Sequence, residues 1–192
     1  NQYPRDPLLP PNLWFSSDPY WRTGYDHGHI CPSADRLNSA EANYQTFFLT
    51  NMQPQVHGFN AGVWQNMETK VRDIASRYNY TFCDTLYICK GGTIDKPQHV
   101  LETTGKGLLV PKYFFMAVLR VKNGVYNAMG FWIEHKASND KKLAKYAVPI
   151  KELEEKTGID FFCNLPDNLE NEVENKPLQA VKSEFRDWGI NQ

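Results

Sequence analysis

Two histidines stand one residue apart in the stretch TGYDHGHICPSADR, which runs from Thr23 to Arg36. His27 and His29 flank a glycine, and Asp26 directly precedes them. Imidazoles at this spacing suit metal ligation or proton transfer by a general base, or they simply pack beside each other. The choice depends on which other polar side chains the fold brings to this segment.

A long amphipathic helix is the element best suited to complete such a site. Apolar residues at helical spacing predict a helix over Ala61–Tyr78. Its buried stripe is expected to consist of Val63, Trp64, Met67, Val71, Ile74 and Tyr78. Asn60 precedes the first turn, and Glu68 and Arg72 lie one turn apart at the edge of the stripe. These three side chains can line a groove, but each also has an ordinary explanation, as a helix N-cap or as an exposed ion pair.

The rest of the chain predicts a mixed α+β fold, in which antiparallel strands surround this helix. Residues 1–20 are rich in proline and are expected to be irregular. We expect short strands at Tyr25–Ile30 and Thr46–Thr50, a strand in DTLYICKGGTI that ends in a Gly-Gly turn, and a β-hairpin around Asn123-Gly124. The expected C-terminal elements are a helix that follows Pro149 and is closed by Gly158, and another that ends near Trp188.

Composition limits the classes of function. The chain has 192 residues, of which 41% are hydrophobic, enough to bury the core of one domain. It contains no run of about eighteen apolar residues, so we expect no membrane span. The formal net charge of −1 argues against a protein that coats nucleic acid through bulk charge. A polyanionic partner would have to be bound by local positive charge.

Four cysteines, at positions 31, 83, 89 and 163, show no C-x-x-C spacing. This spacing argues against a zinc ribbon and against a thioredoxin-type motif. The even count favours disulfides over four free thiols, although a bridge between Cys83 and Cys89 is unfavourable because the strand between them would extend over about 20 Å. Disulfides would place the protein outside the cytosol, so we expect an exported protein that is periplasmic, attached to the cell surface or extracellular.

Two stretches, YDHGHICPSADR and FFLTNMQPQVHGFNAGVWQNMETKVR, together resemble the signature of the DNA/RNA non-specific endonucleases, the ββα-metal nucleases. That pattern is D-R-G-H, then S/T-N-x-x-P-Q, then N-x-G-x-W, then Glu four residues past the Trp and Arg one helical turn later. The match is tight over Gly24–Arg72, and KGGTI, VPKYFF and TGIDFF extend it over most of the chain. The resemblance implies that residues 1–192 form one nuclease domain with the ββα-metal fold, whose central helix carries metal-site residues.

The resemblance also implies roles for particular residues. His29 would be the general base, Asn60 the direct protein ligand of a divalent metal, and Glu68 a group that holds metal-bound waters, while Arg72 would face the phosphate. Mg²⁺, with Mn²⁺ as an alternative, suits this set because hard cations prefer oxygen ligands. A neutral imidazole, with a reference pKa of about 6.5, can take a proton from the attacking water. The expected activity is hydrolysis of phosphodiester bonds in DNA, RNA or both, with little sequence specificity.

Four further residues belong to the expected site. Asp26 and His27 join the catalytic set, and Asn51 and Gln55 are expected at the substrate, bracing the metal-site loop and its waters. His27 departs from the family, which usually has Arg there, and an imidazolium replaces that permanent charge only when protonated. The family also usually carries one or two further strands before a segment like YPRDP, so a processed or truncated chain is expected. The oligomeric state stays open, with a homodimer as one option.

Two other classes of function compete with the nuclease. A zinc hydrolase could use His27, His29 and His57, although no Glu or Cys stands at a suitable helical spacing. A catalytically impaired nucleic-acid-binding protein with the nuclease fold would explain His27 and the lack of basic surplus. It would not need His29, Asn60, Glu68 and Arg72 together. His99 and His135 fall outside the signature and are expected to be ordinary surface or strand residues.

Overall fold

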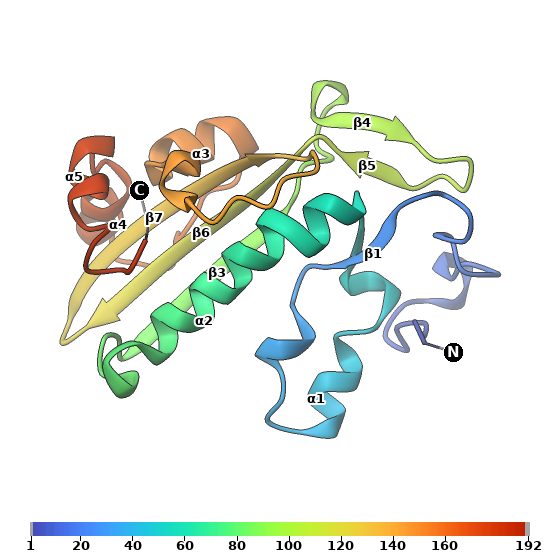
Figure 1. Ribbon diagram of the computed structural model, residues 1–192, viewed down its shortest axis with the longest axis horizontal. Helices are drawn as coiled ribbons and strands as arrows, with labels where there is room; N and C mark the ends of the chain where they lie inside the picture. The colour runs from blue at the N-terminus through green and yellow to red at the C-terminus, as the bar shows by residue number, and fades with distance from the viewer. Residues whose placement is uncertain (1, 191–192) are drawn as a thin grey trace.

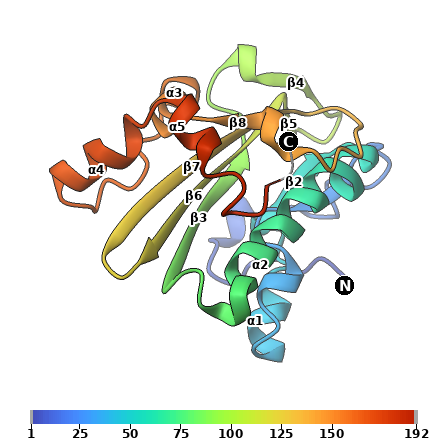
Figure 2. The same ribbon diagram turned by 60° about the vertical axis from the view of Figure 1, so that its left-hand side comes forward.

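The computed structural model describes residues 2–190, and its centre is a four-stranded antiparallel sheet in the order β3-β6-β7-β8. Helix α2 lies along one face of this sheet, and α3 and α4 cover the other (Figure 1, Figure 2). Two small antiparallel pairs, β1 with β2 and β4 with β5, complete the strands. The strands are β1 Asp26–His29, β2 Met52–Gln55, β3 Thr85–Gly92, β4 Val100–Thr103, β5 Leu109–Pro111, β6 Tyr113–Lys122, β7 Val125–Glu134 and β8 Ala147–Val148. The α-helices are α1 Ala40–Gln45, α2 Gln65–Tyr80, α3 Ile150–Thr157, α4 Asp167–Glu174 and α5 Leu178–Ser183.

Strand β6 is buried on both faces, which makes it the centre of two hydrophobic cores. Phe114 and Met116 face α2, whereas Phe115 and Ala117 face α3 and α4. This division follows from the alternation of side chains along a strand. Each large apolar side chain buried here stabilises the fold by about 1.5–3 kcal/mol. The sheet is therefore fixed from both sides and forms a rigid base for α2.

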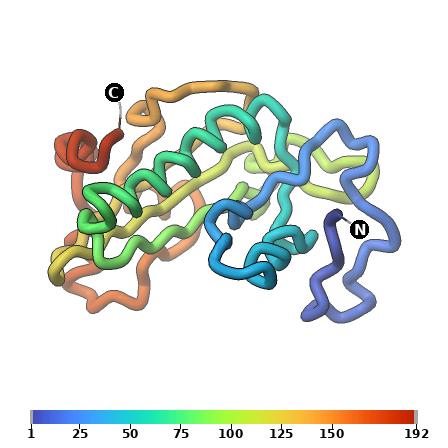
Figure 3. Tube along the Cα trace, turned by 60° about the horizontal axis from the view of Figure 1, so that its bottom comes forward, coloured from blue at the N-terminus to red at the C-terminus, as the bar shows by residue number. Residues whose placement is uncertain are grey.

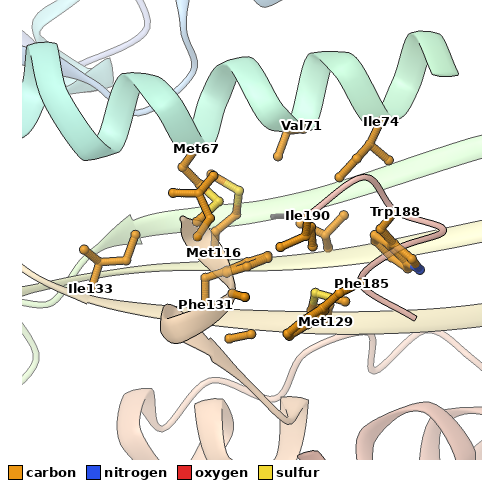
Figure 4. Close-up of a cluster of buried hydrophobic side chains, with 14 of the residues drawn as sticks. Met67, Val71, Ile74, Met116, Met129, Phe131, Ile133, Phe185, Trp188 and Ile190 are labelled. Atoms are coloured by element: carbon orange, nitrogen blue, oxygen red, sulfur yellow. The ribbon is translucent and has the colours of Figure 1, made fainter. Parts of the chain in front are cut away.

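Helix α2 presents its apolar stripe to the sheet. Met67, Val71 and Ile74 point toward strands β6 and β7 and toward the C-terminal residues that follow α5 (Figure 4). This stripe was predicted correctly except at Tyr78, whose side chain is 62% exposed. The helix is interrupted over Arg77–Asn79, where φ of Tyr78 is +52°, so Tyr78 leaves the buried face.

Several expected turns are confirmed. Asn123 and Gly124 both have positive φ and join β6 to β7 in a two-residue hairpin. Helix α3 follows Pro149 and is closed by Gly158 in the left-handed conformation. The proline-rich N-terminal segment lies at one end of the molecule and the C-terminal helices at the other (Figure 3).

Three expected elements are wrong. Residues 46–50 are not a strand, because helix α1, capped by Ser39, runs to Gln45 and a 3₁₀ turn follows at Leu49–Asn51. Gly91 and Gly92 do not form a turn but continue β3. A Cβ on Gly92 would lie 2.5 Å from the Pro111 ring, so glycine is needed there for close approach. The last helix, α5, ends at Ser183, well before Trp188.

The expected disulfides are also wrong, because all four cysteines are free. They lie in separate elements: Cys31 after β1, Cys83 before β3, Cys89 within β3 and Cys163 after α3. The cysteines therefore give no support to an exported location. Within residues 2–190, no helix has both the length and the apolar character that crossing a bilayer requires.

Candidate active site

Strand β1 carries the two histidines and pairs with β2 in antiparallel register. His27 and His29 project to the same side of the strand, while Gly28 faces the other side. A Cβ on Gly28 would come within 2.2 Å of the Gln55 side chain. Glycine is therefore required between the two histidines, because the Gln55 side chain fills the space beside it.

Asn60 lies in a π-helical turn, η4 (Phe59–Trp64), that leads into α2. Its Nδ2 donates a hydrogen bond to Oδ2 of Asp26 at 2.9 Å. A carboxylate only accepts hydrogen bonds, so this contact fixes the NH₂ group toward Asp26 and leaves Oδ1 as the free end of the amide. No side-chain capping bond is formed where this turn begins, so Asn60 is not an N-cap. Its orientation suits an amide oxygen that binds a cation.

His29 ends β1 and carries an unpartnered nitrogen. Its Nε2 is buried without a hydrogen-bond partner in the described part of the chain. Burial lowers the pKa of His29, a hydrogen bond to the His27 backbone acts in the opposite direction, and the charge of Lys90 lowers the pKa further. The ring of Phe47 meets the imidazole edge-on, with 5.1 Å between centroids. His29 is therefore held as a neutral imidazole at ordinary pH, the form that can accept a proton.

Glu68 and Arg72 do not pair with each other, as an ordinary surface ion pair would require. Glu68 accepts from Nζ of Lys90 at 2.7 Å, and only 13% and 8% of these two side chains are exposed. Arg72 instead contacts Asp35, with 2.9 Å between Nη1 and Oδ1. Burial raises the pKa of Glu68, and the ammonium of Lys90 opposes that shift. Two separate ion pairs thus join α2 to β3 and to the segment after β1.

The charges of these groups act on one another. Lys90 lowers the pKa of His29, and the charge of Arg72 lowers that of Glu68. Strand β1 meets the N-terminal part of α2 at one end of the sheet (Figure 1). Asn60 thus lies in the turn that precedes α2, Glu68 and Arg72 lie on α2 itself, and Lys90 connects Glu68 electrostatically with His29 on β1.

The side chain of His27 contacts residues of the N-terminal segment. Its Nε2 lies 3.0 Å from Oδ1 of Asp18. Its ring stacks between Tyr3, at a centroid distance of 3.6 Å, and Tyr20, at 4.2 Å. These contacts make His27 an anchor for residues 3–20, and they do not leave its Nε2 free for a phosphate.

Asn51 and Gln55, both expected at the substrate as braces of the metal-site loop, are half-buried and fully buried respectively. Asn51 accepts from the Cys31 backbone N–H at 2.9 Å and donates to the carbonyls of Cys31 and Thr46, both at 2.8 Å. Gln55 is fully buried, and both polar atoms of its amide lack partners in the described residues. Asn51 thus braces the loop after β1, and the side chain of Gln55 packs against Gly28 of β1.

Three residues were missed or misjudged from the sequence. Lys90 was not considered, although its place on the α2-facing side of a strand was a usable signal, since an unpaired ammonium is seldom buried there. His99 and His135, expected to be ordinary surface or strand residues, are buried with exposed fractions of 9% and 4%. Both lie outside the strands: the imidazole of His99 bonds to Asp95, and that of His135 bonds to the backbone of Val56 and Pro111.

The zinc alternative is not supported by the geometry. His57 bonds to Asp26, with 2.9 Å between Nδ1 and Oδ2, and its side chain is 79% exposed. Across residues 2–190, His27, His29 and His57 do not bring their nitrogens close enough together to share an ion. A site of three imidazoles is therefore absent from the described part of the chain.

Comparison with known proteins settles the family. Residues 3–168 match the model of the DNA/RNA non-specific endonucleases. The chain belongs to this family. It is 34% identical to a nuclease of Nostoc sp. over 82% of this chain and 57% of that protein. It is 29% identical to the mitochondrial nuclease of Saccharomyces cerevisiae over 99% of this chain and 62% of that protein.

The fold agrees with this assignment. A chain in a crystal structure of the EndoG/EndoGI complex superposes with a TM-score of 0.70, at 24% identity, over 85% of this chain and 69% of that one. The expected α+β architecture of the ββα-metal nucleases is therefore confirmed. The chain spans less than two thirds of the length of the Nostoc and yeast relatives.

Proposed function

We propose that this protein is a divalent-metal-dependent endonuclease that hydrolyses phosphodiester bonds of DNA, RNA or both with little sequence specificity. The proposal rests on two side chains: an imidazole with an unpartnered nitrogen and an asparagine whose amide oxygen is available to a metal ion. Among residues 2–190, the Nε2 of His29 has no hydrogen-bond partner, and the bond from Nδ2 of Asn60 to Asp26 leaves Oδ1 of that amide free. Neither feature serves the stability of the fold.

The donor set fits a hard cation better than a transition metal. Asn60 offers an amide oxygen, and Oε2 of Glu68 is not engaged in the ion pair with Lys90. Mg²⁺ or Mn²⁺ needs few protein ligands, because such ions retain several waters. When bound, the cation supplies positive charge that stabilises the phosphate and the leaving oxygen in the transition state. Asn60 would hold it directly, and Glu68 would hold its waters.

The protein's own residues perform the remaining tasks. His29 accepts a proton from the water that attacks phosphorus, and its buried position keeps it neutral for that purpose. Arg72 would bind a phosphate oxygen through the N–H groups that its bonds to Asp35 and Thr69 do not use, and those two bonds fix its direction. Asp26 is a positioning residue, since it acts through the amide of Asn60. Contacts to the phosphodiester backbone carry no sequence information, which explains the expected low specificity.

The alternative of an impaired nucleic-acid-binding protein rests on His27, which replaces the usual Arg and is held by Asp18. A binder needs positive charge at the site but no unpartnered base and no metal ligand. The two functions therefore differ in whether a bound substrate is cut.

The test is digestion of supercoiled plasmid DNA and of single-stranded RNA by the purified chain. Reactions contain Mg²⁺, Mn²⁺, Zn²⁺ or excess EDTA. The proposal expects cleavage at many positions with Mg²⁺ or Mn²⁺ and none with EDTA. A mobility shift without cleavage in any metal would favour the binder, and activity with Zn²⁺ alone would contradict the ligand set.

A further inference from the structure

Three carboxylates meet outside the active site, between α3 and α4. Glu154 belongs to α3, Asp160 follows that helix, and Glu174 is the last residue of α4. One oxygen from each side chain lies within 4.8 Å of the other two. The group lies with the α3 and α4 layer, on the sheet face opposite α2 (Figure 2).

Glu174 is the unusual member of this group. Its side chain belongs to a residue that is only 6% exposed, and its Oε1 is buried without a hydrogen-bond partner in the described residues. A buried acidic group in this state is costly, because no hydrogen-bond donor of the described residues replaces its lost hydration. Its position at a helix C-terminus adds to the cost, since that end carries partial negative charge.

Among the described residues, Glu154 is the only member of the group that forms an ion pair. Lys151 reaches Oε2 of Glu154 at 3.2 Å, and Oε1 of Glu154 accepts the backbone N–H of Phe161 at 3.0 Å. Across residues 2–190, no ammonium or guanidinium lies within ion-pair distance of Asp160 or Glu174. Burial, followed by the charge of Glu154, raises the pKa of Glu174 to about 7.

We infer that Glu154, Asp160 and Glu174 form a second metal site that binds a hard divalent cation of the Ca²⁺ class. All the donors are oxygens, which excludes a preference for zinc. Ca²⁺ tolerates irregular geometry and accepts carboxylates through one or both oxygens, whereas Mg²⁺ demands a near-ideal octahedron. Asp160 is exposed, so water can complete the coordination from its side.

Such a site would have a structural role. The ion would join α3, the turn after it and the end of α4, which are elements that pack over the second hydrophobic core. Binding to the folded state alone would raise its stability by mass action. The alternative for the same three residues is that Glu154 and Glu174 share a proton and need no ion.

The experiment uses the full chain with Asn60→Ala, so that the direct ligand of the proposed active-site metal is absent. Thermal unfolding and isothermal titration are measured with CaCl₂ against NaCl of equal ionic strength. We expect one saturable Ca²⁺ site and a Tm increase of about 5–10 °C when Ca²⁺ exceeds its Kd about 100-fold. Adding Asp160→Asn or Glu174→Gln should abolish the Ca²⁺-dependent increase.

The matched control is Glu152→Gln, which removes a carboxylate from the outside of the same helix and should retain the full increase. The quantity compared is the Ca²⁺-dependent increase in Tm, not Tm itself. Glu174→Gln removes a buried charge and can raise the Tm of the ion-free protein, and this comparison is not affected by that change. Asp160 is exposed, so Asp160→Asn tests the site without disturbing the core. The inference would be overturned if the parent showed no saturable Ca²⁺ response. It would also be overturned if Asp160→Asn and Glu174→Gln kept the same Ca²⁺-dependent increase in Tm as the parent.

Discussion

His29 and His135 show how two regions of this protein use the same side chain. Burial lowers the pKa of both imidazoles. Nε2 of His135 accepts the backbone N–H of Val56 at 2.8 Å, and its Nδ1 donates to the carbonyl of Pro111 at 2.7 Å. In the described part of the chain, Nε2 of His29 instead has no hydrogen-bond partner. Burial alone therefore does not distinguish a structural histidine from a reactive one, whereas the state of its nitrogens does.

The same contrast extends to the surroundings of the two residues. His135 contacts the rings of Phe59 and Phe114 in the core between α2 and the sheet. The charge of Lys90, which forms a largely buried ion pair with Glu68, acts on His29. A region that serves stability satisfies its polar groups, and a region that serves chemistry leaves some of them for a ligand.

The largest effect should come from replacing His29. His29→Ala is expected to lower the rate of metal-dependent cleavage by about 10²–10⁴-fold, because that is the usual contribution of a general base. Initial rates of plasmid nicking, together with Tm, measure this. His99→Gln is the matched control, since it removes an imidazole held by Asp95 away from the active site. Partial rescue of His29→Ala by added imidazole would support the role, and a folded variant with near-normal turnover would refute it.

Asn60 and its partner should control metal affinity. Asn60→Ala is expected to raise the metal concentration for half-maximal activity by at least about tenfold, and Asp26→Asn should do so by about 10–100-fold through the lost orientation of the amide. Cleavage rates across a Mg²⁺ titration give both values. Asn66→Ala, on the same helix but bonded to Asn139 and Asp140, is the control. If Asn60→Ala and Asp26→Asn gave the same Mg²⁺ titration curve as the control Asn66→Ala, the amide of Asn60 would not be a metal ligand.

His135 should affect stability and leave chemistry unchanged. His135→Leu is expected to lower the free energy of unfolding by about 1–3 kcal/mol, because the Val56 N–H loses its acceptor. The pKa of His135 is depressed in the folded state. Its contribution to stability is therefore complete above about pH 6.5 and is lost as the pH falls below that value. Urea unfolding from pH 5 to 8 should show a weaker acid dependence in His135→Leu, and an unchanged dependence would contradict the buried neutral state.

The smallest effect is expected at His27. An arginine there can still stack on Tyr3 and pair with Asp18, so its charge would be neutralised before it reaches a phosphate. His27→Arg should change the cleavage rate by less than about threefold, with a flat ratio to wild type from pH 6 to 9. A gain of about five- to thirtyfold that grows with pH would show that this position acts on the phosphate.

Much of the fold follows from patterns that the sequence displays locally. The α2 stripe, the hairpin at Asn123-Gly124 and the closure of α3 by Gly158 depend on periodicity and turn chemistry, and each was predicted. The Gly91-Gly92 pair was mistaken for a turn, because its glycines are needed for contacts with residues distant in sequence. The free cysteines show the same limit, since pairing depends on tertiary distance.

The site likewise contains residues that the sequence pattern predicts and residues that it does not. The motif spacing predicts that His29, Asn60, Glu68 and Arg72 form one site; the structure has His29 on β1, Asn60 in the turn before α2, and Glu68 and Arg72 on α2. The partners that orient them, Lys90 foremost, come from other elements and carry no local pattern. The environment of His27 was hidden for the same reason, because Asp18 and two tyrosines reach it through the irregular N-terminal segment.

The most direct test of His29 as a neutral base is the pH dependence of kcat/KM for plasmid cleavage at saturating Mg²⁺. Because burial lowers its pKa, the acid limb of the wild-type profile should lie below pH 6.5. The residual activity of His29→Ala should lack that limb. An acid limb at or above pH 6.5 in wild type, or the same limb in His29→Ala, would contradict the assignment.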